Sequence, residues 1–165
     1  MIYLLHGDNE FEKRAALAAL VGDADVMRRD GEALTLADIQ EITIGQTLFT
    51  QSSVYVISRL SENPDIWPRL PEILFDDDNT IILVENKLDK RTKTCKWLQK
   101  TAKTQEFVAL GDRQKPQLIT WCETQAHERG YKLTRKQIGM LIDRLGFDQL
   151  RLSNFLDQLA LAEKI

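Results

Sequence analysis

The sequence contains few of the residues that bind metals or build nucleophilic sites. Its 165 residues include 2 cysteines and 2 histidines, and neither Cys95 nor Cys122 belongs to a Cys-x-x-Cys or His-x-x-x-His spacing. A zinc site needs closely spaced thiol and imidazole ligands. We therefore expect no metal site and two buried free thiols. His6 and His127 have no nearby serine or cysteine with a carboxylate, so a catalytic triad is not expected either.

Long apolar runs are also absent. No stretch approaches the roughly 18 apolar residues that suggest a membrane span, and the first residues lack the basic start and cleavage site of a signal peptide. We therefore expect a cytoplasmic protein. The 43% hydrophobic and 28% charged residues fit a globular chain rather than a disordered or fibrous one. The length suits one domain or two small ones.

The net charge of −3 conceals an uneven distribution along the chain. Residues 1–85 hold 6 basic and 16 acidic side chains, a net charge of −10. Residues 86–165 hold 16 basic and 9 acidic side chains, a net charge of +7. This asymmetry suits the second part of the chain for contact with a polyanion or with an acidic protein surface.

Short β-prone runs alternate with helical patterns over the first two thirds of the chain. The run 80–84 is apolar throughout, which is typical of a strand buried on both faces of a sheet. The alternation predicts an α/β fold with a parallel sheet of about five strands flanked by helices. Strands are expected at 2–5, 25–28, 54–58, 80–84 and 106–109. Helices are expected at 10–21, 64–74 and 90–103, and a further helix is expected to begin after Thr35, whose hydroxyl pairs with Asp38 as a cap. The prolines of 64–74 make that helix short or kinked.

The pattern changes after Gly111, because three helical runs follow with no strand between them. These runs cover 114–129, 134–145 and 150–162. The first two end at Gly130 and Gly146, the residue type that most often follows a helix. We therefore expect an α/β domain at 1–111 and a small three-helix domain at 112–165.

The turn after the first strand is where a nucleotide-binding protein of this class would carry its P-loop. That loop reads Gly-x-x-x-x-Gly-Lys-Ser/Thr, and its backbone N–H groups and lysine hold the phosphates. Here Gly7 is followed by Asp8-Asn9-Glu10, without a second glycine or a Lys-Ser/Thr pair. The carboxylates at the start of this helix would repel a triphosphate.

The second half of an ATPase site is incomplete as well. The apolar strand at 80–84 ends in Glu85-Asn86, whereas metal binding and water activation usually use two adjacent acids. The sequence therefore predicts an ATPase-like scaffold without an ATPase site, with no cofactor and no catalytic residues.

An apolar pair, Leu48-Phe49, interrupts the polar segment 46–53 between the second helix and the third strand. The two side chains either fold back against the edge of the sheet or form an exposed wedge for a pocket on another protein. Burial of a leucine or a phenylalanine contributes roughly 1.5 to 3 kcal/mol each. Such a pair can anchor a complex.

Basic side chains gather between residues 87 and 103, where Asp89 is the only acid. The spacing of Lys93, Lys96 and Lys100 places them along one helical face. The segment is either a solvated face or a contact with DNA phosphates or an acidic subunit, and nothing in it selects among bases. The candidate contact residues are Lys90, Arg91, Lys93, Lys96 and Lys100.

Along its whole length the sequence resembles the delta subunit of the bacterial DNA polymerase III clamp loader. The stretches that carry the resemblance are 2–11 (IYLLHGDNEF), 46–49 (QTLF), 86–91 (NKLDKR), Trp121, and 152–159 (LSNFLDQL). Each stretch is short, but their order and spacing together match the family.

The resemblance implies an AAA+-like (P-loop NTPase-like) α/β domain followed by a helical lid. In this family the subunit carries no nucleotide and opens the ring-shaped sliding clamp, the beta subunit, for loading onto primed DNA during replication. An apolar pair at a helix end enters a pocket on the clamp, and the matching pair here is Leu48-Phe49. The subunit is a non-catalytic component of the DNA-directed DNA polymerase, a nucleotidyltransferase (transferase) complex, and its other partners are the loader subunits whose ATP binding exposes this element.

One feature departs from the family. Its members continue into a helical collar domain that assembles the loader, whereas this sequence stops at Ile165. We therefore expect either a fragment of a longer protein or an atypical member. The alternative function is a nucleic-acid-binding AAA+-like module that acts through residues 87–103. In the clamp-loader interpretation DNA is contacted only indirectly or weakly.

Overall fold

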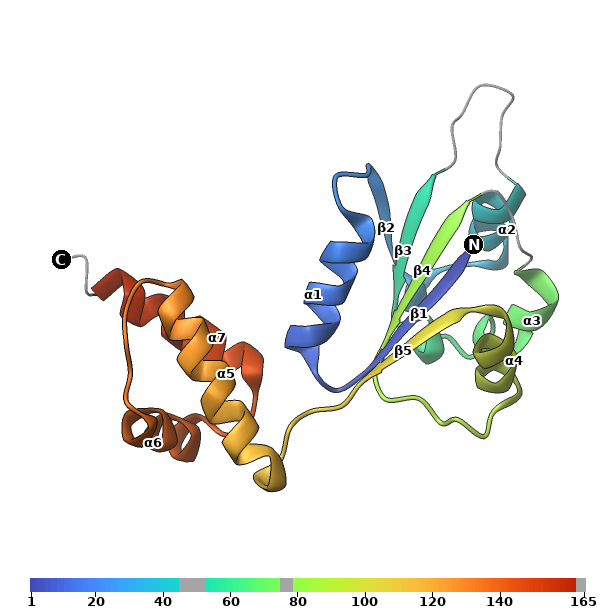
Figure 1. Cartoon of the computed structure of the whole chain (residues 1–165). Helices are drawn as coiled ribbons and strands as arrows, with labels where there is room; N and C mark the ends of the chain where they lie inside the picture. Colours follow the sequence, from blue (N-terminus) through green and yellow to red (C-terminus); the bar gives the residue numbers. More distant parts are fainter. Residues whose placement is uncertain (45–52, 75–78, 163–165) are drawn as a thin grey trace. The chain divides into compact units, whose positions relative to one another are not determined.

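The structure, a computed structural model, describes residues 1–44, 53–74 and 79–162 (Figure 1). Its contacts divide the chain into two compact units. The first comprises Met1–Asp8 and Lys13–Phe107, and the second comprises Asn9–Glu12 and Val108–Ile165. The chain thus passes from the first unit to the second between Phe107 and Val108.

A parallel sheet forms the centre of the first unit. Its order is β2-β3-β4-β1-β5, and every neighbouring pair is parallel (Figure 1). The predicted fold class is therefore confirmed. The strands are β1 (Ile2–Gly7), β2 (Val26–Asp30), β3 (Val54–Ser58), β4 (Thr80–Glu85) and β5 (Lys103–Phe107).

Helices cover both faces of this sheet. Helix α1 (Glu10–Val21) lies on one face, and α2 (Leu36–Ile44), α3 (Leu70–Ile73) and α4 (Lys93–Thr101) lie on the other (Figure 1). Short 3₁₀ helices at Gly31–Ala33, Leu60–Glu62 and Trp67–Arg69 complete the connections. The prolines of the expected helix at 64–74 divide it into a 3₁₀ turn and the single turn of α3.

Alternating side chains of the central strands fill two separate cores, as expected for strands buried on both faces. Ile81, Ile82 and Leu83 are each at most 1% exposed. Ile81 and Leu83 join the core beneath α2 and α4, whereas Ile82 joins Leu5 and Val56 beneath α1.

Two expected elements begin three residues away from their predicted starts. Strand β5 starts at Lys103 rather than 106. It is an edge strand that pairs only with β1 and leaves polar side chains exposed, so its first residues carry no apolar alternation that would mark a strand. Helix α4 starts at Lys93, since the hydroxyl of Thr92 caps it by accepting a hydrogen bond from the Cys95 N–H at 3.3 Å. The helix expected over 90–103 is therefore present but shorter, covering Lys93–Thr101.

Three helices form the second unit: α5 (Lys115–Glu128), α6 (Arg135–Leu145) and α7 (Gln149–Ala162). A reciprocal capping box between Thr134 and Gln137 starts α6, and Gly146, at φ +82°, follows its end. Their shared core contains Leu118, Cys122, Ile138, Ile142 and Leu152.

The segment Asn9–Glu12 contributes to the second unit. The ring of Phe11 meets that of Trp121 edge to face, with centroids 5.0 Å apart. The Asn9 side-chain amide donates a hydrogen bond to the Gln149 side-chain oxygen at 2.7 Å, and both side chains are buried. This four-residue segment is thus grouped with the helical unit, although three of its residues begin α1.

Both cysteines are buried and unpaired. Burial raises the pKa of the Cys122 thiol to about 11. Within the described residues, no cluster of three or more His, Cys, Asp and Glu side chains could hold a metal ion. No helix in that part of the chain is long and apolar enough to cross a membrane.

Candidate functional site

The predicted site residues fall into two groups. Leu48 and Phe49 lie outside the described residues, between the end of α2 and the start of β3. The five basic residues lie in and just before α4, and the structure describes all of them.

The buried amide of Asn79 joins the two ends of the segment that contains the apolar pair. Its side-chain oxygen accepts a hydrogen bond from the Ser53 N–H at 3.0 Å, and its amide nitrogen donates to the Ile42 carbonyl at 3.1 Å. Asn79 is 4% exposed, and its bond to Ile42 is buried while that from Ser53 is partly buried. The last turn of α2 and the residue before β3 are therefore held together by one side chain.

Lys13 occupies the junction beyond the carboxyl ends of β1 and β4. Open α/β sheets bind ligands at such a point, where neighbouring strands send their connections to opposite faces. Here β1 leads to α1 and β4 leads to α4, on opposite faces (Figure 1). The Lys13 side chain is 2% exposed, and its ammonium donates to the carbonyls of Gly7 and Glu85 at 2.9 Å each.

Gly7 is required for close packing of strands at the same junction. It adopts φ +124°, and a Cβ atom there would lie 2.0 Å from the carbonyl oxygen of Phe107 in β5. No larger residue fits, because the obstructing atom belongs to the backbone. The glycine that resembles the first residue of a P-loop therefore serves the β1–β5 contact.

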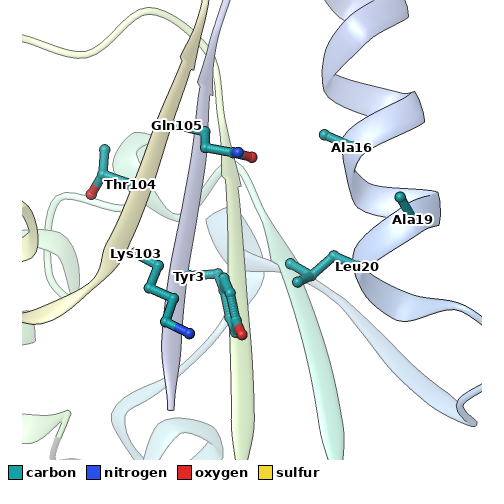
Figure 2. A pocket seen from close by; sticks show the side chains of 7 residues that line it. All are labelled: Tyr3, Ala16, Ala19, Leu20, Lys103, Thr104 and Gln105. Atoms are coloured by element: carbon teal, nitrogen blue, oxygen red, sulfur yellow. The ribbon is translucent and has the colours of Figure 1, made fainter.

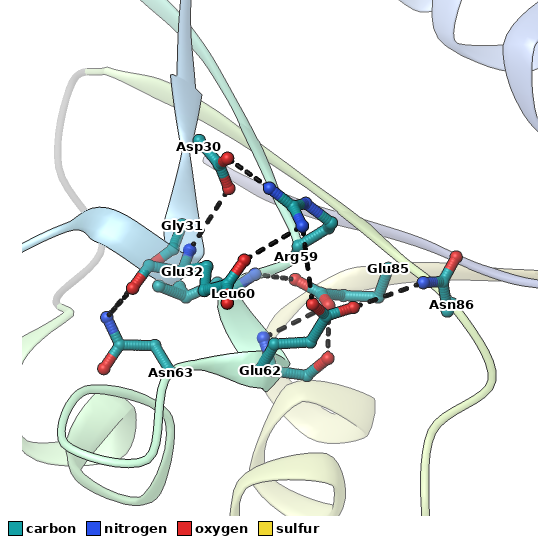
Figure 3. A network of polar contacts seen from close by, with 10 residues as sticks. Asp30, Gly31, Glu32, Arg59, Leu60, Glu62, Asn63, Glu85 and Asn86 are labelled. Atoms are coloured by element: carbon teal, nitrogen blue, oxygen red, sulfur yellow. Dashed lines mark hydrogen bonds and ion pairs between the residues drawn. The ribbon is translucent and has the colours of Figure 1, made fainter.

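Glu85 is the last residue of β4, the position near which an ATPase carries its Walker-B acids, and it is 1% exposed. It accepts hydrogen bonds from the Leu60 N–H at 2.8 Å, the Ser61 N–H at 3.2 Å and the Ser61 hydroxyl at 2.5 Å (Figure 3). Burial raises the pKa of Glu85 and outweighs these hydrogen bonds, which lower it. The carboxylate thus anchors the 3₁₀ helix that follows β3.

A surface cluster of charges surrounds this anchor. Arg59, at φ +60°, contacts Asp30 and lies 2.9 Å from Glu32 and 3.6 Å from Glu62 (Figure 3). The Asp30 contact raises the pKa of the guanidinium. These ion pairs link β2 to the turns that follow β2 and β3. Because all four side chains are well exposed, the pairs contribute little to stability.

Four of the five predicted basic residues line one groove of about 510 Å³ on α4. Its lining residues are Arg91, Lys93, Lys96, Trp97 and Lys100. Lys90 is not among them, and its ammonium instead bonds the Glu106 carboxylate at 2.5 Å. Sequence reasoning missed Trp97, although its spacing of four from Lys93 and three from Lys100 places it on the same helical face.

A second cavity, of about 550 Å³, lies between α1 and the strands β1 and β5 (Figure 2). It exists because Ala16 and Ala19 are too short to reach the sheet. The Lys103 ammonium lies 5.4 Å from the centroid of the Tyr3 ring on the neighbouring strand, a cation–π contact. Lys103 therefore lines a different cavity from Arg91, Lys93, Lys96 and Lys100.

Lys13→Met should destabilise the first unit by about 2–4 kcal/mol. The substitution leaves two buried carbonyls without their donor, and each unpaired group costs about 1–3 kcal/mol. Urea unfolding measures the effect, with Lys87→Met as the control because Lys87 is exposed. A Lys13 variant as stable as this control would contradict the assigned role.

The free energy of unfolding should depend on pH through Glu85. Burial raises its pKa above the ordinary value of 4.5, so the folded state binds the proton more tightly than the unfolded state. Stability from this group is therefore lost as the pH rises from about 4.5 through the raised pKa. Glu85→Gln cannot ionise and should gain stability relative to wild type over that rise. Urea unfolding across this range, with the exposed Glu41→Gln as control, tests this, and parallel profiles for wild type and Glu85→Gln would refute it.

Comparison with known proteins identifies a structural relative but no sequence family. No family model and no curated protein sequence matches the chain. The structure is similar to that of the Bacillus subtilis DNA clamp loader delta protein (YqeN), with a TM-score of 0.59 and 14% sequence identity. The similarity covers 97% of this chain and 52% of that protein, so the chain spans about half its length. The five-stranded parallel sheet with its flanking helices is thus an AAA+-like α/β fold.

Proposed function

We propose that this protein is a clamp-loader delta-like subunit that binds a sliding clamp and opens its ring for loading onto primed DNA. The observation that carries the proposal is the structural similarity, over 97% of the chain, to a protein described as a DNA clamp loader delta protein. The order of the short sequence stretches that resemble the delta family supports the same function.

The proposed contact with the clamp is the apolar pair Leu48-Phe49. Burial of both side chains in a pocket would contribute roughly 1.5 to 3 kcal/mol each. The Asn79 hydrogen bonds to Ile42 and Ser53 support this role, because they fix both ends of the segment and so lower the entropy lost on binding.

The proposed subunit acts without a nucleotide of its own and is not an enzyme. Two features favour this: the Lys13 ammonium fills the junction of β1 and β4, and the Glu85 carboxylate is used by Leu60 and Ser61. Energy for the loading cycle would come from ATP-binding partner subunits. Because the chain spans about half of the similar clamp-loader protein, assembly with those subunits is part of the proposal.

Replacing the apolar pair tests the clamp contact directly. Leu48→Ala with Phe49→Ala should weaken binding to the sliding clamp of the same organism at least about tenfold, because it removes most of the buried apolar area. Titration calorimetry measures the affinity. The control is Val108→Ala with Met140→Ala, since these side chains are 63% and 52% exposed on other elements. Equal affinities of the two double variants would refute the assignment.

Asn79→Ala should weaken clamp binding although Asn79 is not proposed to contact the clamp. Its loss frees the Ile42 carbonyl and the Ser53 N–H and so releases both ends of the segment. The matched control is Asn63→Ala, because Asn63 is equally buried and donates to the carbonyls of Gly31 and Leu34. Both variants should lose about 1–3 kcal/mol of stability. Only Asn79→Ala should lower clamp affinity, and an equal loss in both variants would contradict the positioning role.

A further inference from the structure

The outward face of α4 combines cations with an aromatic ring in one groove. Lys93, Lys96, Trp97 and Lys100 follow one another at intervals of three, one and three residues, which places them on neighbouring turns of one face. Arg91 joins them from the turn that precedes the helix. No acidic side chain lines this groove of about 510 Å³ within the described part of the chain.

The cations of this groove are available to a ligand. Among the residues that the structure describes, Lys96 and Lys100 take part in no ion pair. Lys93 lies 3.3 Å from Glu72, and both side chains are more than half exposed. Exposed pairs of this kind contribute little, so Lys93 can exchange its partner for another anion. Arg91 is held more firmly, since its guanidinium makes two hydrogen bonds to Asp89 and holds the pKa of that carboxyl at about 2.

Trp97 is fixed in position within the groove. Part of the indole packs against the core beneath α4, while the rest of the half-buried side chain lines the groove. An aromatic ring held in this way loses little conformational entropy when a ligand stacks on it. The groove therefore presents part of a fixed indole ring between lysines on adjacent turns.

We propose that this groove binds single-stranded nucleic acid, with phosphates on Lys96 and Lys100 and a base stacked on Trp97. Cations alone would suit any polyanion, but single strands also offer unpaired bases that stack on aromatic side chains. A duplex keeps its bases stacked within the helix, and an acidic protein has no equivalent ring. This activity goes beyond clamp binding and uses different residues.

Fluorescence anisotropy of a labelled oligothymidylate of about 20 nucleotides tests the proposal on the full chain. Binding should weaken steeply between about 50 and 200 mM salt, because phosphate contacts release counterions. A duplex of the same length and a polyglutamate chain of similar charge should bind at least about tenfold more weakly than the single strand. Failure of the single strand to bind at low salt, or equal binding of either competitor, would overturn the proposal.

Charge reversal tests the phosphate contacts. Lys96→Glu with Lys100→Glu should reduce affinity for the single strand at least about tenfold. The matched control, Lys132→Glu with Lys136→Glu, changes the net charge equally at exposed sites of the second unit and should alter affinity by less than about twofold. Equal losses in the two variants would assign binding to overall charge and refute the groove.

An abasic oligonucleotide isolates the role of Trp97. It keeps the phosphates but offers no base, so wild type should bind it at least about fivefold more weakly than oligothymidylate. Trp97→Leu should bind both oligonucleotides equally, and Trp97→Phe should restore the preference in part. These ratios compare two ligands on one protein and do not depend on the stability of the variant. A preference that persists in Trp97→Leu would refute the stacking contact, whereas the clamp affinity of that variant should stay unchanged.

Discussion

The hydrogen bonds from the Lys13 ammonium to the backbone carbonyls of Gly7 and Glu85 attach α1 to the ends of two strands in the first unit. Both carbonyls end neighbouring parallel strands at a position with almost no access to water, where unpaired oxygens are costly. A buried ammonium is equally costly without acceptors. Because donor and acceptors satisfy each other, α1 is fixed to the sheet where β1 and β4 end. The arrangement needs no bound phosphate or metal ion to satisfy it.

Three residues near this strand junction make structural contacts within the first unit. Gly7 permits the close approach of β5, Lys13 pairs the strand ends, and Glu85 secures the turn after β3. Each residue type has a counterpart in an ATPase site, but its contacts here are made within the protein. The contacts of these three residues therefore hold the strand junctions of this sheet together from within the first unit.

Sequence reasoning succeeded where a local signal dominates. Strand β3 was predicted at its observed residues 54–58, and the cap at Thr35 was predicted from its hydroxyl and the carboxylate of Asp38 three residues later. The first residues of β5 and α4 were misplaced. Strand β5 is a polar edge strand without apolar alternation, and the basic residues before Thr92 resemble the rest of α4, so the Thr92 cap was not recognised.

The site residues that were missed depend on contacts between distant parts of the chain. The roles of Glu85 and Asn79 arise from partners 24 to 37 residues away, which no spacing rule reveals. The burial of Lys13 could have been predicted from the sequence, because Lys13 shares a helical face with Leu17 and Leu20, which pack on the sheet. A lysine on the buried face of a helix indicates that its ammonium has internal acceptors.

The burial of both cysteines makes this chain well suited to site-specific chemical labelling. Cys122 lies in the helical core, and its raised pKa leaves very little reactive thiolate near neutral pH. Cys95 lies on the buried face of α4. A single cysteine placed at an exposed position would therefore react with a maleimide dye far faster than either native thiol. With one such cysteine in each unit, distances between the units can be followed by energy transfer without first removing the natural cysteines.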